Sequence, residues 1–389
     1  MKNRALLSIL LLTLPLPVVA QPAPAPAAVP TPAAPPAPPA RPAAVVSPEV
    51  APGRRVTFRL KAPGAKAVAV RGQWSKEPLT LTMGENGVWS AEAGVLPAGI
   101  WEYSFTVDGL TMTDPGNSAV KPMREPRTSI LHLAAEPPQP WDFQDVPHGA
   151  VHQHSYLSRA QQGPRELCVY TPPGYETSGA EKYPLLVLQH GSGDNQQTWT
   201  THGKAHWILD SLIAAGKCRP MIVLMLDGHP LRRVSNQDPT ARTRAMDAFR
   251  GELFDDALPL VEARYRVASG VENRGIVGLS MGGGQSLTTG LGHLDRFSWV
   301  GAFSGVPADD SVATALYVDP AAANAKMRLL WIACGKDDFL LKRNEDFTGK
   351  LREHGINHEW HATAGDHSWP VWRGYLTEFL PRLFQPAKP

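Results

Sequence analysis

A serine, two adjacent aspartates and a histidine follow one another along this chain in an order that suits nucleophilic catalysis. Ser280 comes directly after the apolar run GIVGL, Asp337 and Asp338 follow MRLLWIACGK, and His367 lies near the C-terminus in TAGDHSW. A serine hydroxyl is a poor nucleophile until a histidine takes its proton, and a carboxylate must orient that histidine. The order therefore predicts acyl transfer, and the spacing alone leaves the choice between the two aspartates open.

The residues on either side of Ser280 predict a turn that would expose its hydroxyl. The segment reads GIVGLSMGGG, in which the apolar run is a candidate strand and the small residues form a candidate helix start. Glycines at positions 278 and 282 would let the chain turn tightly without Cβ clashes. A G-x-S-x-G pattern between a strand and a helix is typical of a nucleophile elbow, and the alternative is an ordinary glycine-serine turn.

A second glycine turn could supply hydrogen-bond donors to the oxygen that becomes negative during acyl transfer. The sequence HGSG occupies residues 190–193, directly after YPLLVLQ. We expect the backbone N–H of Ser192 to be the first donor and that of Met281, the residue after the serine, to be the second. An ordinary glycine turn is again the alternative.

Apolar runs alternate with helix-like stretches in the C-terminal part of the chain. Helix-like patterns cover 204–216, 245–266 and 341–353, and the apolar runs are RELCVYT, YPLLVLQ, MIVLML, GIVGL, WVGAF and MRLLWIA. Strands that are apolar throughout are buried on both faces, as in a mostly parallel sheet covered by helices. The predicted fold class is α/β, with Ser280 at the carboxyl end of the sheet.

A different pattern fills residues 54–135. The runs RVTFRLKAP, AVAVRGQW, VWSAEAG and WEYSFTVDG alternate apolar with polar residues and are separated by Gly, Pro or Asn. Such short, half-buried strands predict a small immunoglobulin-like β-sandwich ahead of the α/β region. Trp74 and Trp101 could stack on sugars, but tryptophans in a small sandwich more often belong to its core, so we expect a packing role first.

The first 53 residues precede both predicted domains. Residues 1–20 combine Lys2 and Arg4 with a short apolar stretch and small residues before Gln21, which predicts a secretory signal peptide. Residues 21–53 are rich in proline and alanine and predict a semi-rigid linker. The protein is expected to be exported, periplasmic or secreted, without a membrane-spanning segment.

Composition argues against several classes of partner and cofactor. The 389 residues carry 38 Lys and Arg against 36 Asp and Glu, a net charge of +2, which gives no electrostatic footprint for nucleic acid. The three cysteines are too scattered for a zinc site or a disulfide framework. His358 and His361 lack the neighbouring ligands of a metal site. We therefore expect no metal and no organic cofactor.

Eight motifs between residues 146 and 386 carry a family resemblance: VPHG, RELCVYTPPGYE, LLVLQHGSGDN, LPLVEARYRV, RGIVGLSMGG, FSG, ACGKDDFL and GDHSWPVWRGYLTEFLPRLF. This region resembles carbohydrate esterase family 1, the feruloyl and acetylxylan esterases of the esterase D-like α/β-hydrolases, a branch that also contains enterochelin esterases. The resemblance implies Ser280 as nucleophile, His367 as base and Asp338, the last residue of G-x-x-D, as acid. Residues 54–135 resemble the early-set domains grouped with family 48 carbohydrate-binding modules.

The leading hypothesis is a serine esterase that hydrolyses feruloyl (hydroxycinnamoyl) esters of plant polysaccharide, with an acylated polysaccharide or oligosaccharide as substrate. Trp199, Trp369 and Phe339 lie near the predicted catalytic loops and could line an aromatic acyl pocket, or could equally be core residues. The alternatives are an acetylxylan esterase and an enterochelin-type siderophore esterase. The stretch 227–250 could be a solvated surface, as is usual for such a run of charge, or could hold the anionic substrate of a siderophore esterase through Arg232, Arg233, Arg242, Arg244 and Arg250. The remote alternative is an inactive carbohydrate-binding protein.

Overall fold

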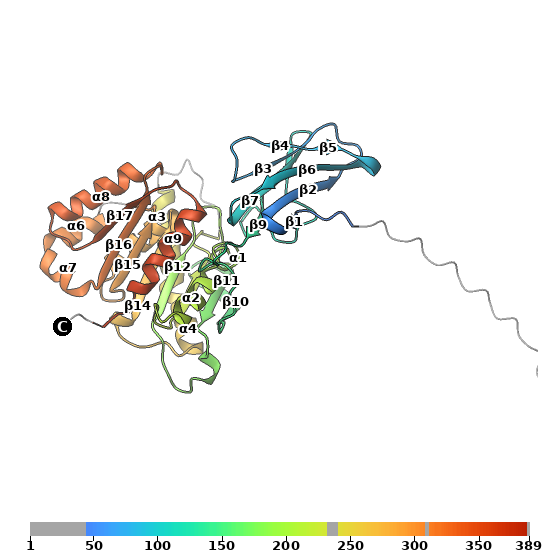
Figure 1. Ribbon diagram of the computed structural model, residues 1–389. Coiled ribbons are helices and arrows are strands. Elements are labelled where there is room, and N and C mark those ends of the chain that lie inside the picture. The colour runs from blue at the N-terminus through green and yellow to red at the C-terminus, as the bar shows by residue number, and fades with distance from the viewer. Residues whose placement is uncertain (1–43, 232–239, 308–310, 387–389) are drawn as a thin grey trace, which may run out of the picture. The chain divides into compact units, whose positions relative to one another are not determined.

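The computed structural model describes residues 44–231, 240–307 and 311–386 (Figure 1). The predicted signal peptide, most of the predicted linker, and Arg232 and Arg233 lie outside these residues. From Val45 onward the described residues belong to one compact unit. Within them, no helix is both long enough and apolar enough to cross a bilayer.

Two antiparallel sheets share one hydrophobic core in the N-terminal part of this unit. Their strand orders are β1-β2-β6-β5 and β4-β3-β7-β8, and β9 also pairs with β7. Alternate residues of β2, namely Val56, Phe58 and Leu60, are buried in that core. The predicted β-sandwich is confirmed. The strands are β1 Glu49–Ala51, β2 Arg55–Lys61, β3 Val68–Gly72, β4 Leu79–Thr80, β5 Thr82–Met83, β6 Val88–Val95, β7 Gly99–Val107, β8 Leu110–Met112 and β9 Ser129–Leu133.

The two tryptophans of the sandwich pack within it. Trp74 stacks on Phe58 with 5.5 Å between the ring centroids. The indole N–H of Trp101 donates to the carbonyl oxygen of Pro97 at 3.0 Å. Both rings pack against the sandwich core, which agrees with the packing role expected first.

Ordered structure begins before the predicted domain boundary at residue 54. Strand β1 pairs with the start of β2, and the buried Ser47 donates a hydrogen bond to Asp114 at 2.7 Å. The predicted linker of residues 21–53 therefore ends too late. Proline content predicted a linker, but it could not show that the last residues of the predicted segment have partners elsewhere in the chain.

An eight-stranded sheet forms the centre of the C-terminal part, in the order β10-β11-β13-β12-β14-β15-β16-β17. Strand β11 runs antiparallel to its neighbours, and the six strands β12 to β17 are mutually parallel. The predicted α/β fold with a mostly parallel sheet is confirmed. The strands are β10 Ala150–Ser158, β11 Gly163–Thr171, β12 Leu185–Gln189, β13 Ile222–Leu226, β14 Arg274–Leu279, β15 Trp299–Phe303, β16 Leu329–Gly335 and β17 Glu359–Thr363.

Helices cover both faces of this sheet, which explains why its strands are apolar throughout. In β12, Leu185 and Val187 face one core, while Leu186 and Leu188 face the other. The first core is covered by α3 to α8 and the second by α1, α2 and α9, and Figure 1 shows α9 in front of the sheet. The helices are α1 Thr198–Thr201, α2 Ala205–Ala214, α3 Ala241–Glu252, α4 Leu258–Arg264, α5 Met281–Gly292, α6 Ser311–Val318, α7 Pro320–Lys326, α8 Leu341–Glu353 and α9 Trp369–Phe379.

Short helical turns complete the described chain. Leu253–Ala257 is a π-helical turn between α3 and α4, so the helix-like stretch 245–266 is found as three segments. Pro259, the second residue of α4, has no N–H to donate to the preceding turn. The 3-10 turns are Pro52–Arg54, Glu85–Gly87, Tyr175–Thr177, Val271–Asn273 and Leu380–Arg382.

Candidate active site

Ser280 lies in a strained turn between β14 and α5. Its backbone angles are φ 50° and ψ −115°, a region that a residue with a side chain occupies only when its surroundings hold it there. Its N–H donates to the carbonyl oxygen of Phe303 on β15 at 2.8 Å, and its own carbonyl oxygen accepts from the N–H of Gly284 at 3.0 Å. These hydrogen bonds tie the turn to the next strand and to its own helix.

The glycines flanking Ser280 are required by close packing. A Cβ on Gly282 would lie 2.4 Å from the carbonyl oxygen of His190, and one on Gly278 would lie 2.6 Å from the backbone of Gly282. Neither glycine has a positive φ. The G-x-S-x-G pattern therefore exists here because α5 begins directly against the end of β12, with no space for side chains between them.

The structure brings Ser280, His367 and Asp338 together. Nε2 of His367 lies 2.9 Å from Oγ of Ser280, and Nδ1 lies 2.8 Å from Oδ2 of Asp338. Because a carboxylate only accepts hydrogen bonds, Nδ1 carries the proton and Nε2 is left to accept one from the serine hydroxyl. This is the tautomer that a general base at Ser280 requires.

The two adjacent aspartates have different surroundings. The side chain of Asp338 is fully buried, and its Oδ1 accepts from the N–H of Leu340 at 2.8 Å. Burial raises the pKa of Asp338, but the hydrogen bonds from His367 and Leu340 outweigh it, and the pKa lies below its usual value. Asp337 is exposed, and its backbone N–H donates to Gly365 at 3.0 Å.

Two aromatic rings flank His367. Phe339 lies 4.4 Å from the imidazole, centroid to centroid, and is 75% exposed. Trp372 meets the imidazole edge to face at 4.9 Å, and its indole N–H donates to Oγ of Ser304 at 3.0 Å. Trp372 is buried and restrains the histidine, whereas Phe339 offers an apolar surface to whatever approaches Ser280.

The turn of residues 191–194, which we name the oxyanion turn after the role predicted for it, lies beside Ser280. A Cβ on Gly191 would be 3.5 Å from Cβ of Ser280. Ser192 and Met281, the two predicted donors, line the same cavity as Ser280. Met281 is the first residue of α5, and the first N–H groups of a helix have no partner within it, so they suit an anion.

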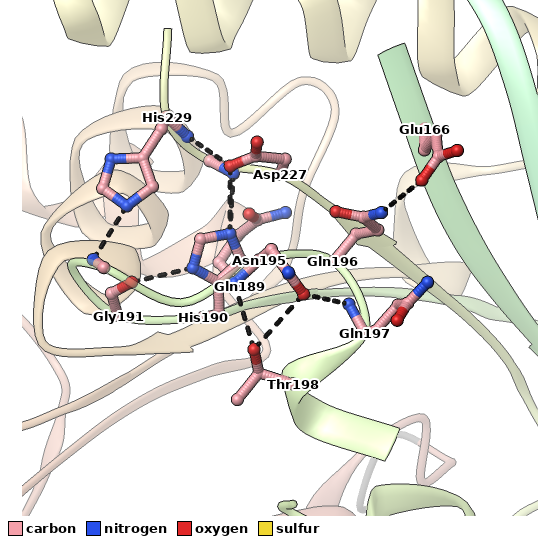
Figure 2. A network of polar contacts seen from close by, with 12 residues as sticks. Glu166, Gln189, His190, Gly191, Asn195, Gln196, Gln197, Thr198, Asp227 and His229 are labelled. Atoms are coloured by element: carbon pink, nitrogen blue, oxygen red, sulfur yellow. Dashed lines mark hydrogen bonds and ion pairs between the residues drawn. The ribbon is translucent and has the colours of Figure 1, made fainter. Parts of the chain in front are cut away.

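Two histidines hold the backbone around the oxyanion turn, as Figure 2 shows. Nε2 of His229 accepts from the N–H of Gly193 at 2.9 Å. His190 accepts from the N–H of Gly228 through Nε2 at 2.9 Å and donates through Nδ1 to the carbonyl oxygen of Gly191 at 2.8 Å. Burial, together with the neighbouring His190, lowers the pKa of His229 to about 4. His229 is therefore neutral near pH 7 and can accept.

A buried arginine supports the segment that carries His229. Arg165 on β11 donates to the carbonyl oxygens of Asp227 and His229 at 2.5 and 2.9 Å. It also pairs with Glu252, at the end of α3, at 2.9 Å. The oxyanion turn is thus connected through His229 and Arg165 to the sheet and to α3.

A cavity of about 410 Å³ opens at Ser280. Its apolar lining includes Met246, Val306 and Leu340, and two guanidinium groups, Arg242 of α3 and Arg343 of α8, also line it. No aspartate or glutamate is among the described residues that line this cavity. The site can accept a largely apolar group that also carries hydrogen-bond acceptors or negative charge.

Two of the predicted substrate residues do not reach this cavity. Trp199 and Trp369 are 1% and 2% exposed and pack edge to face against each other beneath the site. Their assignment as pocket residues was wrong, because proximity to a catalytic loop in sequence does not distinguish a wall from the core behind it. Phe339 lies next to His367 as expected, and Arg232 and Arg233 lie outside the described residues.

Sequence reasoning missed the supporting residues of the site. His190 stands in the HGSG motif, and His229 follows an apolar strand in DGHP. Both histidines come just after the carboxyl end of a strand, where site residues of a parallel sheet gather, so this position could have indicated them. Arg242 lies in the arginine-rich stretch 227–250, which the sequence already offered as an anion-binding segment. Arg343 had no such signal. Elsewhere, Nε2 of His154 lies 2.6 Å from the hydroxyl of Tyr265, and no three potential metal-ligating side chains come together in the described part of the chain.

Comparison with known proteins places these features in a family. A model of the putative esterase family matches residues 158–383, more than half of the chain. The chain belongs to this family. The predicted resemblance to esterases is thereby confirmed, and with it the prediction of a carboxylic ester hydrolase at the level of the family.

Individual relatives agree with this membership. The chain is 29% identical over 347 residues to an endo-1,4-beta-xylanase/feruloyl esterase from Xylanibacter ruminicola, with 84% of the chain and 44% of that relative covered, so it spans less than half of the relative's length. A solved ferulic acid esterase is similar with a TM-score of 0.54 at 26% identity, covering 61% of this chain and 99% of the other. The enterobactin esterase from Shigella flexneri shares the fold, with a TM-score of 0.61 at 20% identity over 86% of this chain and 94% of the other.

Proposed function

We propose that this protein hydrolyses carboxylic esters through a covalent acyl-enzyme on Ser280. The observation that carries the proposal is the continuous hydrogen-bonded chain from Ser280 through His367 to Asp338, with distances of 2.9 and 2.8 Å, at the wall of a cavity. A nucleophile, its base and the group that orients the base are the three components that acyl transfer requires.

In the first half of the reaction, Oγ of Ser280 attacks the ester carbonyl carbon while Nε2 of His367 takes its proton. Asp338 stabilises the imidazolium that forms, and the N–H groups of Ser192 and Met281 donate to the oxyanion. When the tetrahedral intermediate collapses, His367 passes the proton to the departing alcohol. Water then attacks the acyl-enzyme with His367 as base, which releases the acid and restores the serine.

Replacing Ser280 by alanine tests this proposal. We expect hydrolysis of an activated ester such as p-nitrophenyl acetate to fall by about 10⁴-fold or more, since the covalent route is lost. The variant should keep the wild-type circular dichroism spectrum and melting temperature. A folded Ser280→Ala protein with near wild-type turnover would contradict the triad.

Feruloyl or other hydroxycinnamoyl esters of plant polysaccharide are the substrates that we propose. The apolar lining of the cavity and the exposed ring of Phe339 beside His367 suit a flat aromatic acyl group. The names of the Xylanibacter ruminicola relative and of the solved ferulic acid esterase agree with this choice.

A second candidate class is an ester that carries negative charge, such as a catecholate trilactone. Arg242 and Arg343 line the cavity, and guanidinium groups bind carboxylates and phenolates well. The relative from Shigella flexneri is named an enterobactin esterase. A neutral hydroxycinnamoyl ester also finds donors in these arginines, so their presence does not decide against it.

Ionic strength distinguishes the two classes. We expect kcat/KM to be highest for feruloylated arabinoxylan fragments and methyl ferulate, and to change less than about threefold between low and high salt, because stacking and burial are not screened. Preference for the trilactone over ferulate and acetylated xylan, with a steep loss of kcat/KM in salt, would establish the anionic class instead.

We further propose two domains, a β-sandwich that begins before residue 54, includes β1, and ends at 135, and an α/β domain at 146–386, together with export directed by residues 1–20. Separate hydrophobic clusters support the division, and the basic and then apolar start of the sequence supports export. N-terminal sequencing of protein secreted by an expressing bacterium tests the latter. A mature chain that still begins at Met1 would contradict it.

A further inference from the structure

The residues that follow β8 of the sandwich run along the oxyanion turn. Met123 forms an antiparallel β-bridge with Asp194, and the N–H of Arg124 donates to the carbonyl oxygen of Gly193 at 2.9 Å. Just before them, the carbonyl oxygen of Pro122 accepts a hydrogen bond from the hydroxyl of Thr198 at 2.6 Å. We call residues 121–124 the strap.

The first residue of the strap lies between two buried carboxylates. Nζ of Lys121 is 3.2 Å from Oδ1 of Asp194 and 3.1 Å from Oε1 of Glu102, which is on β7 of the sandwich. The three side chains are between 5% and 12% exposed. A single ammonium group therefore joins the sandwich to the last residue of the oxyanion turn.

The charges in this cluster depend on Lys121. Burial raises the pKa of Asp194, and the Lys121 ammonium opposes that rise. Burial also raises the pKa of Glu102, but the imidazole of His202, 3.3 Å away, and the charge of Lys121 outweigh it and lower the pKa to about 2. Without the ammonium, two buried carboxylates would lie near each other with less compensation, so Asp194 would have to move or bind a proton.

The position of Asp194 matters because the backbone beside it is held on both sides. The N–H of Gly193 donates to His229, and its carbonyl oxygen accepts from Arg124. Ser192, whose N–H is the proposed oxyanion donor, is the neighbour of this doubly held glycine. Such donors stabilise a transition state only if their direction is fixed before the charge develops.

We propose that Lys121 is a positioning residue, which acts through Asp194 to fix the oxyanion turn and so makes the strap and Glu102 part of the catalytic apparatus. This inference rests on the proposed function, because it assumes that the N–H of Ser192 binds the oxyanion. It predicts that a lysine outside the α/β domain controls kcat on esters too small to touch the sandwich.

The test is a double-mutant cycle on the full chain with p-nitrophenyl acetate. We expect Lys121→Met to lower kcat by about 10- to 100-fold while KM changes less than about threefold, because one donor is misdirected and ground-state binding is kept. Asp194→Asn should lower kcat through the same turn. The Lys121→Met/Asp194→Asn double variant should lose no more than the worse single variant, because the two residues act as one unit.

Lys204→Met is the matched control. Lys204 is half-buried, less buried than Lys121, and lies over the Trp207 ring, 4.5 Å from its centroid. We expect this variant to keep kcat within about twofold, with all assays run well below each melting temperature. If Lys121→Met does not fold, Asp194→Asn alone decides, and an unchanged kcat in that variant overturns the inference.

Three other outcomes would also overturn the inference that Lys121 positions the oxyanion turn. These are a Lys121→Met variant with wild-type kcat, losses in the double variant that multiply, or a loss of kcat in Lys204→Met as large as that in Lys121→Met. Failure of the proposed function would look different, since hydrolysis would then survive in Ser280→Ala. The two failures are therefore distinguishable in one set of assays.

Discussion

The buried carboxylate of Asp338 accepts a hydrogen bond from Nδ1 of His367 at 2.8 Å, whereas the adjacent Asp337 is exposed. Two neighbouring residues with the same side chain thus have different environments, because Asp338 turns back into the site and accepts the N–H of Leu340 as well. The carboxylate that faces the imidazole determines which of its nitrogens carries the proton.

Asp338→Asn should therefore be far more damaging than Asp337→Asn. An amide in place of the Asp338 carboxylate favours the wrong tautomer of His367 and cannot stabilise the imidazolium, so we expect kcat to fall by about 10³- to 10⁴-fold. Asp337→Asn serves as the matched control and should stay within about twofold. Steady-state kinetics on an activated ester measure both, and a larger loss in the Asp337 variant would reverse the assignment.

Gly282→Ala should disturb both stability and catalysis. The new Cβ would lie 2.4 Å from the carbonyl oxygen of His190, which is backbone and cannot rotate away. We expect a lower melting temperature and a kcat reduced at least about 10-fold, since the displaced strand end leads into the oxyanion turn. Gly349→Ala in α8 meets nothing within 4 Å and should stabilise by about 0.5–1 kcal/mol. Equal melting temperatures for the two variants would contradict the packing argument.

The stability of the protein should decrease on acidification from pH 6.5 to 4, in part through His229. Its pKa is lowered from 6.5 to about 4 in the folded state. Between these pH values the unfolded chain binds more protons than the folded chain, so the free energy of unfolding decreases as the pH is lowered. His229→Gln can still accept from the N–H of Gly193 but does not titrate. Its melting temperature should decline less across this window than that of the wild type. Parallel curves would show that His229 is not involved.

Phe339→Ala should change substrate preference without lowering stability. The ring is 75% exposed and lies beside His367, so its loss removes contact with an aromatic acyl group and leaves the core intact. We expect KM for methyl ferulate to rise about 5- to 20-fold and kinetics on p-nitrophenyl acetate to stay within about twofold. Phe143→Ala, which removes another exposed ring, is the control. An equal effect on both esters would argue against an acyl contact.

The core elements were predictable because their patterns are local. The buried strands show continuous apolar runs, and α8 (Leu341–Glu353) has the bounds that the pattern at 341–353 predicted. The position of Ser280 after β14 could also be predicted, since the G-x-S-x-G turn reports a steric requirement within a few residues. The structure places His367 and Asp338 beside it. Chain order pointed to a histidine and to one of two aspartates, and only the family resemblance chose Asp338.

Features that depend on distant contacts could not be read in this way. The burial of Trp199 is set by Trp369 and by the carbonyl oxygen of Gln189, which accepts its indole N–H at 2.9 Å. The role of His229 depends on Gly193, and Arg343 reaches the cavity from a helix that carries no motif. In each case the relevant partner is distant in the sequence, and the local pattern does not identify it.

The hydrogen bond from Arg124 to Gly193 bears on how chains of this kind can be recombined. A chimera that joins a foreign sandwich to the α/β domain between residues 136 and 145 would exchange the strap and separate it from the turn that it borders. A junction placed before Lys121 would keep the strap, though it would still lose Glu102. The structural unit that supports Ser280 therefore starts at the strap, before the family match at residue 158. Exchanging modules at residue 158 would separate segments that pack against each other.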